Sequence, residues 1–333
     1  MQLGYLNATV FEWVVLIWAL VSFPLYITVI AVLLRFRKQR NFKNAFFKLC
    51  ISEAVADIGV FICSLFLLCF RMWGWIDFGP LFYHPTLGQY FRMSYYVMSY
   101  LFGMPQVTGV AIIGFNRFCS IVYSGNRVAQ WNSKQLAVSL SIQWSTGALA
   151  VVPWATQFGH FEVELVNLSI SQQYLQTRPS RRFQSLYYLT TGGLVLLVVA
   201  LVGLMYSVMF WRLWRRKRRN TGNSTSSHSE KAQIRMALMG FVLFLLLLCY
   251  TLFMVGMSVA LRMGKFEVKH VISILIYQTG IVFSLVNPYL LLGFSKHTRR
   301  AFFKFVGLAK PNNSTVSVQS PSYARKRRTE PAL

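Results

Sequence analysis

Acidic residues are scarce in this sequence, and the basic residues are confined to particular segments. Only 9 of the 333 residues are Asp or Glu, against 34 Lys or Arg, so the formal net charge is +25. In a soluble protein such a charge would suggest a nucleic-acid partner. Here the basic residues flank long apolar stretches, so they indicate orientation in a membrane, and we expect no nucleic-acid partner.

The residues that intramembrane enzymes and pumps need are missing from the apolar stretches. No Lys lies between Lys269 and Lys296, which excludes the Schiff base of a retinal pump in the last stretch. The histidines that an intramembrane metal hydrolase would need all lie in loops or at the ends of apolar stretches: His84, His160, His228, His270 and His297. We therefore expect no enzyme activity, no metal and no cofactor.

Cysteines are absent from the predicted outer loops. The five cysteines lie within the apolar stretches or at their ends: Cys50, Cys63, Cys69, Cys119 and Cys249. We expect small buried side chains and no extracellular disulfide.

Seven apolar stretches of about twenty residues or more make up most of the sequence. A hydrocarbon core about 30 Å thick takes about 20 helical residues to cross. The sequence therefore predicts an all-α membrane protein, a seven-transmembrane helix bundle. The predicted spans are 13–34, 45–70, 93–122, 135–156, 183–213, 236–261 and 271–292.

The basic residues are unequally divided between the two sides of this bundle. Seven spans place the termini on opposite sides, and 26 of the 34 Lys and Arg fall on the side of the C-terminal tail. The positive-inside bias predicts an extracellular N-terminus (1–12), a receptor domain (13–306) and a disordered cytoplasmic tail (307–333) in a multi-pass plasma-membrane protein. Asn7 and Asn167 stand in sequons on the predicted outer side, where glycans are attached.

Two segments on the predicted cytoplasmic side are rich in basic residues. The segment 215–235 opens with Arg215-Arg216-Lys217-Arg218-Arg219 and then turns polar, so we expect a mobile loop. The segment 294–306 predicts a short amphipathic eighth helix on membrane lipid, with its apolar residues on one face: Phe294, Ala301, Phe302 and Phe305.

Two acids, Glu53 and Asp57, break the apolar pattern of the second span. They lie one helical turn apart, and ionisable groups inside a membrane are candidates for function. Three interpretations of Asp57 stay open: a proton or cation site, a polar hinge bonded to another span, or a packed residue satisfied by Asn287 or Ser284. Glu53 lies nearer the inner end, where we expect it to reach the interface or pair with a basic residue.

Motifs in four spans carry a resemblance to the rhodopsin-like G-protein-coupled receptors. Asn116-Arg117-Phe118 at the inner end of span three resembles their Asp-Arg-Tyr signature. The surroundings of Asp57, Trp144 with Pro153, and Asn287-Pro288-Tyr289 are similar to their motifs in spans two, four and seven.

Differences from the rhodopsin-like motifs make the resemblance more specific. The prolines of spans five and six and the outer Cys pair of that class are absent, and Asn116 replaces its Asp. Phe46-Phe47-Lys48-Leu49 and Arg71-Met72-Trp73-Gly74-Trp75, with the motifs above, resemble the nematode serpentine chemoreceptors of class V, in the class-gamma superfamily.

The resemblance implies a chemosensory receptor for a small extracellular ligand that activates a heterotrimeric G protein, with sensory cilia as a candidate location. It assigns G-protein coupling to Asn116, Arg117 and Phe118, and a mid-bundle switch to Asp57, Asn287 and Pro288. By depth, the candidate ligand-pocket residues are Tyr96, Tyr100, Gln106, Tyr188, Thr191, Met257, Tyr277 and Gln278. Aromatic rings with a few polar tips suit a small, largely apolar ligand.

One alternative class stays open, a seven-span cation channel or transporter in which Glu53 and Asp57 line the path. Such a protein needs further polar residues along one stripe, and the spans contain few.

Overall fold

A computed structural model describes residues 10–39, 42, 44–65, 87–123, 131–156, 162–169, 172–178, 181–219, 228–264 and 266–308. Asn7, Cys69, the Arg71-Met72-Trp73-Gly74-Trp75 motif and the tail from residue 309 lie outside these ranges. The predicted structure of those parts stays a prediction.

Helices make up most of the described chain. They are α1 (Val10–Phe36), α2 (Ala45–Leu65), α4 (Leu87–Val122), α5 (Ser133–Ala155), α6 (Arg181–Arg219), α7 (His228–Arg262), α8 (Phe266–Phe294) and α9 (Lys296–Phe305). Two strands, β1 (Glu162–Ser169) and β2 (Gln172–Arg178), pair antiparallel.

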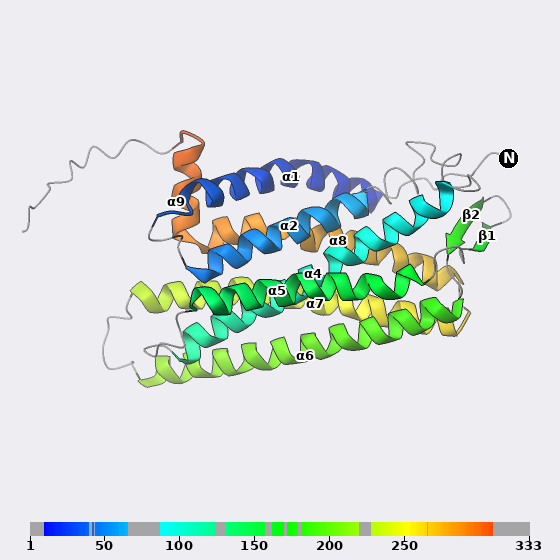
Figure 1. Cartoon of the computed structure of the whole chain (residues 1–333). Coiled ribbons are helices and arrows are strands. Elements are labelled where there is room, and N and C mark those ends of the chain that lie inside the picture. The colour runs from blue at the N-terminus through cyan, green and yellow to red at the C-terminus, as the bar shows by residue number, and fades with distance from the viewer. Residues whose placement is uncertain are drawn as a thin grey trace, which may run out of the picture.

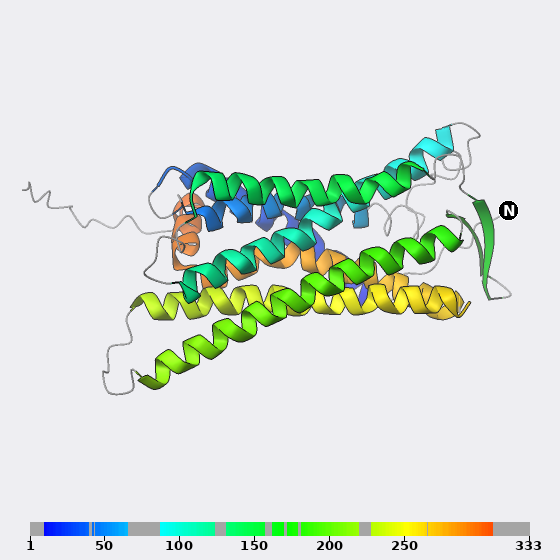
Figure 2. The same ribbon diagram turned by 60° about the horizontal axis from the view of Figure 1, so that its bottom comes forward.

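Seven of these helices run side by side as one elongated bundle (Figure 1). α1 begins at the same end as the β1–β2 hairpin, and α9 lies across the opposite end, as the second view also shows (Figure 2). α4 has contacts with α2, α5, α6 and α7, which makes it the central helix of the bundle.

Six described helices are long and apolar enough to cross a membrane: α1, α4, α5, α6, α7 and α8. The described part of α2 has 21 residues, and any 18-residue stretch of it contains Lys48, Glu53 and Asp57. α2 nevertheless packs against α1, α4 and α8 within the bundle. The sequence-predicted second span is therefore present as a bundle helix, distinguished from the others by its charge.

The structure corrects the prediction of a loop at 215–235. α6 continues to Arg219, so the basic run is helical, and α7 begins at His228. Arg and Lys are good helix formers, and a long apolar helix can extend through them into water. Only residues 220–227 of the predicted loop lie outside the described residues.

The β1–β2 hairpin was not predicted, and it qualifies the all-α prediction. It lies between α5 and α6, with Leu165 opposite Leu175 and a register shift between Asn167 and Ser169. Its sequence mixes polar and β-branched residues without the Asn-Gly or Asp-Gly turn that marks a short hairpin.

The predicted amphipathic helix at 294–306 is present as α9. Ser295 caps it, since its Oγ accepts a hydrogen bond from the backbone N–H of Thr298. Phe294, Ala301 and Phe302 pack against the main apolar cluster of the bundle, whereas Phe305 is exposed. Most of the apolar face of α9 thus packs on the end of the bundle, and its last residue, Phe305, remains exposed.

Glycines allow the helices of the bundle to approach closely. A Cβ on Gly147 of α5 would lie 2.4 Å from the backbone oxygen of Leu101 on α4 and 2.8 Å from Pro105 Cγ. Lipid chains are as apolar as Leu, so close van der Waals packing replaces the hydrophobic effect in holding such helices together.

Gly147→Ala should therefore destabilise the bundle although Ala is the better helix former. Neither the backbone oxygen of Leu101 nor the proline ring can rotate away, and overpacking costs about 1–3 kcal/mol. Gly193→Ala, at an exposed position of α6, is the matched control, because nothing lies within 4 Å of its Cβ. Thermal unfolding of the purified variants should show a lower midpoint for Gly147→Ala alone, and equal midpoints would contradict this packing.

Candidate functional site

The carboxyl group of Asp57 is the centre of a buried polar cluster. It accepts hydrogen bonds from Tyr26 Oη, from Gln106 Nε2 at 2.7 Å and from Asn287 Nδ2 at 2.6 Å. Gln106 Nε2 also donates to Ser284 Oγ at 2.9 Å. These residues come from α1, α2, α4 and α8, so one side chain joins four helices.

The cluster includes both partners that the sequence proposed for Asp57. Asn287 contacts it directly, and Ser284 is connected through Gln106. The sequence analysis did not identify Tyr26 as a partner of Asp57, because no motif in α1 marks this tyrosine as functional. Pro288 lies inside α8 beside Asn287.

Glu53 contradicts its predicted position near the membrane interface. It is 1% exposed, and its Oε2 accepts a hydrogen bond from Gln143 Nε2 at 3.0 Å. Its Oε1 is buried without a hydrogen-bond partner among the described residues. The side chain turns into the contact of α2 with α4 and α5, where Gly109 leaves room for it.

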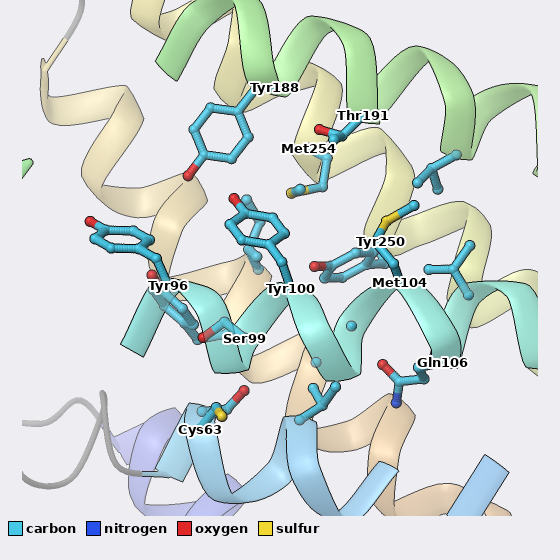
Figure 3. A pocket seen from close by; sticks show the side chains of 18 of the residues that line it. Cys63, Tyr96, Ser99, Tyr100, Met104, Gln106, Tyr188, Thr191, Tyr250 and Met254 are labelled. Carbon is cyan, nitrogen blue, oxygen red and sulfur yellow. The ribbon is translucent and has the colours of Figure 1, made fainter. Parts of the chain in front are cut away.

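A cavity of about 120 Å³ lies among α2, α4, α6, α7 and α8, lined mainly by the first halves of α4, α6 and α8 (Figure 3). By comparison, a buried cavity of about 150 Å³ holds a benzene-sized molecule. Its lining is mostly aromatic and apolar with several hydroxyls, which suits a small ligand with few polar groups.

Seven of the eight sequence-predicted pocket residues line this cavity: Tyr96, Tyr100, Gln106, Tyr188, Thr191, Met257 and Tyr277. Gln278 is not among the lining residues. It is 3% exposed, and neither polar atom of its amide has a hydrogen-bond partner among the described residues. Successive helical residues are rotated by about 100°, so Tyr277 faces the cavity while Gln278 faces elsewhere.

Other lining residues were not predicted, among them Cys63, Tyr95, Ser99, Met104, Tyr250 and Met254. Helical spacing could have found part of this set. Ser99 lies three residues after Tyr96, and Tyr250 precedes Met254 by four and Met257 by seven, so each shares a face with a predicted residue.

Trp154 holds the aromatic wall of the cavity in place. It is fully buried at the end of α5, and its indole stacks on Tyr96 at 4.4 Å and on Tyr100 at 5.1 Å between ring centroids. The hydroxyls of Tyr100 and Tyr188 point toward each other across the space (Figure 3). The wall is thus pre-formed rather than built from free side chains.

Gln106 belongs to both the cavity and the polar cluster. Its amide nitrogen contacts Asp57 and Ser284, and its amide oxygen points toward the cavity (Figure 3). A ligand that donates a hydrogen bond to this oxygen would polarise the amide and strengthen its bond to Asp57. The two sites therefore share one side chain.

Arg117 lies near the opposite end of α4 and stacks on an aromatic ring. Its guanidinium carbon is 3.5 Å from the centroid of Phe46 on α2, and its buried Nε has no hydrogen-bond partner among the described residues. Asn116 is buried, and Phe118 packs against the apolar cluster around Tyr206. Glu230 precedes the sixth predicted span and is an acid that could pair with Arg117, but its side chain lies outside the described residues.

The described residues contain no cluster of His, Cys, Asp and Glu with the geometry of a metal site. Within the same residues Cys50, Cys63, Cys119 and Cys249 are free thiols.

Comparisons with known proteins identify one family and one similar receptor. The family described as "Serpentine type 7TM GPCR chemoreceptor Srv" matches residues 15–308. The chain is also similar to Serpentine receptor class V-1 of Caenorhabditis elegans, with 27% identity over 222 residues, which cover 64% of this chain and 67% of that protein.

The buried position of Glu53 can be tested through Gly109. A Cβ at Gly109 would lie 1.7 Å from Glu53 Oε2 and 2.5 Å from Gln143 Nε2, so Gly109→Ala should reduce the yield of folded protein. Shortening the acid in Gly109→Ala/Glu53→Ala should restore most of it, because the closest clash is with that side chain and Gln143 loses the carboxylate that holds its amide there. Fluorescence-detected size-exclusion chromatography measures both, and a double variant no better than Gly109→Ala would contradict this location of Glu53.

Proposed function

We propose a sensory function from one premise: the chain belongs to the Srv family of serpentine seven-transmembrane chemoreceptors. It is a multi-pass membrane protein of a receptor family, not of an enzyme family. Its proposed activity is to bind a small extracellular molecule in the cavity beside Tyr100 and Tyr188 and to activate a heterotrimeric G protein at the other end of the bundle.

The contact of Gln106 with both the cavity and Asp57 carries this proposal. A ligand that moves or polarises Gln106 changes the hydrogen bonds that join α2, α4 and α8. Pro288 removes one helical hydrogen bond in α8 next to Asn287, which gives that helix a flexible point. Asp57, Asn287 and Pro288 are thus the proposed switch.

Arg117, Asn116 and Phe118 form the proposed contact for the G protein. Stacking on Phe46 retains Arg117 less firmly than an ion pair with an Asp at position 116 would, because cation–π contacts are worth about 0.5–2 kcal/mol. A movement of α2 relative to α4 would therefore release the guanidinium readily.

The proposed topology has residues 1–12 outside and the tail from residue 307 in the cytoplasm, with seven spans between them. The excess of Lys and Arg at the end that carries α9 supports this orientation. Asn7 and Asn167 are the proposed glycan acceptors on the outer side.

A cation channel or transporter is less well supported. Donors of three other helices surround Asp57, and Glu53 faces Gln143 rather than an open path. A conduction path needs polar groups that exchange partners with water or ions.

The ligand proposal predicts a pocket-blocking variant. Gly103 lines the cavity, and nothing lies within 4 Å of its Cβ position, so Gly103→Leu should fold normally while filling much of the space. In a screen of odorants and small lipophilic molecules with a G-protein activation readout, an active compound should lose at least about tenfold in potency. Gly193→Leu, at an exposed position of α6 outside the cavity lining, is the control. Equal potency in all three proteins would exclude this cavity as the binding site.

The coupling proposal predicts a separation of signalling from expression. Arg117→Ala removes charge-assisted hydrogen bonds worth about 1.5–3 kcal/mol to a G protein, so activation should fall by at least about tenfold. Surface expression should be retained, because Arg117 makes no ion pair among the described residues. Full activation by Arg117→Ala would contradict this assignment. Arg300→Ala, at an exposed position of α9, is the control that removes the same charge.

The orientation can be measured directly. An epitope fused to the N-terminus should be stained by antibody in intact cells, whereas one fused to the C-terminus should require permeabilisation. The reverse pattern would overturn both the orientation and the assignment of Arg117 to the cytoplasmic side.

A further inference from the structure

The cytoplasmic extension of α6 has a face that changes from apolar to aromatic to basic as the helix leaves the membrane span. Positions spaced by three and four residues share a face. Along this face Leu197, Leu201 and Leu204 are exposed, followed by Trp211 and then by Arg215 and Arg218. The stretch of α6 that is apolar enough to cross a membrane ends at Arg215.

Two Trp–Arg stacks occupy this end of α6. The guanidinium carbon of Arg215 is 3.9 Å from the ring centroid of Trp211, and that of Arg218 is 3.8 Å from the ring centroid of Trp214. Trp211 and Trp214 are 47% and 51% exposed, so both stacks stand on the outside of the bundle.

The opposite side of the same turn anchors the helix. Leu213 is buried in the apolar cluster around Tyr206, and Arg212 Nη1 donates to the backbone oxygen of Val122 on α4 at 2.7 Å. The two stacks are therefore presented on a fixed helical surface.

We propose that this surface binds an anionic phospholipid with a multiply phosphorylated inositol headgroup. Trp is favoured in the glycerol region of a membrane, and guanidiniums bind phosphate oxygens through two N–H groups at once. Arg215 and Arg218 lie about one helical turn apart, so their positive charges match two separate phosphates.

Charge complementarity supports a multiply charged headgroup over a singly charged one. Six basic residues fall within 212–219, and the whole of α6 contains no acid. Each basic residue near an anionic surface contributes about 1 kcal/mol, so the loss of two corresponds to at least about tenfold in affinity.

The test uses the full-length protein in phosphatidylcholine nanodiscs that contain a few mole percent of phosphatidylinositol bisphosphate, with bound lipid counted by native mass spectrometry. Arg215→Gln/Arg218→Gln should lower the affinity at least about tenfold. The control Arg300→Gln/Lys304→Gln removes two exposed basic residues of α9, so it measures the loss that follows from lower positive charge alone, and this loss should be clearly smaller. Thermal unfolding in pure phosphatidylcholine verifies that each variant is folded.

Further variants and competitors identify the source of recognition. Arg215→Lys/Arg218→Lys keeps the charge but loses the planar stack, and Trp211→Leu/Trp214→Leu keeps the arginines, so both should weaken binding. Phosphatidylserine and soluble inositol trisphosphate should compete poorly, since each lacks part of the ligand. Equal losses in the α9 control, unchanged binding in the arginine variants, or displacement by phosphatidylserine or the free headgroup would overturn the proposal.

Discussion

The hydrogen bonds to Asp57 are the interaction on which the arrangement of this bundle depends. Hydrocarbon offers a buried polar group no water, so its partners must come from the protein. Asp57 finds them on α1, α4 and α8, from residues 31, 49 and 230 positions away in the sequence. No local structure can supply such partners, so these bonds exist only when four helices have assembled at one depth.

The cluster specifies an arrangement more than it adds stability. Hydrogen bonds between membrane helices average about 0.6 kcal/mol, because partners are also found before assembly. Close packing supplies the remaining attraction, and it depends on small residues. Gly59 accommodates the ring of Phe102, since a Cβ there would lie 2.2 Å from Phe102 Cγ. Polar contacts thus select which helices meet, and glycines set how closely they approach.

The sequence predicted those features that follow from composition over a long window or from motif position. Apolar length gave the helices of the bundle, and the depth of Asn287 gave its contact with Asp57. The buried position of Glu53 could not be predicted from composition or motifs, because it depends on the space that Gly109 leaves on another helix. The helical basic run and the hairpin were missed because polar composition alone does not distinguish a loop from an extended helix or a short strand pair.

Gln106 offers a way for the cavity and the adjoining polar cluster around Asp57 to act as one unit without any large movement between them. Both hydrogen bonds of its amide nitrogen are to the cluster, and its oxygen points toward the cavity. An amide transmits a change at its oxygen to its N–H groups, because the two ends are conjugated. A shift of the Gln106 side chain would also leave Asp57 with an unfilled hydrogen-bonding site in a medium where water cannot replace it. In the proposed mechanism, the low polarity of the surroundings, which makes the cluster costly to break, would therefore also make it responsive to a ligand.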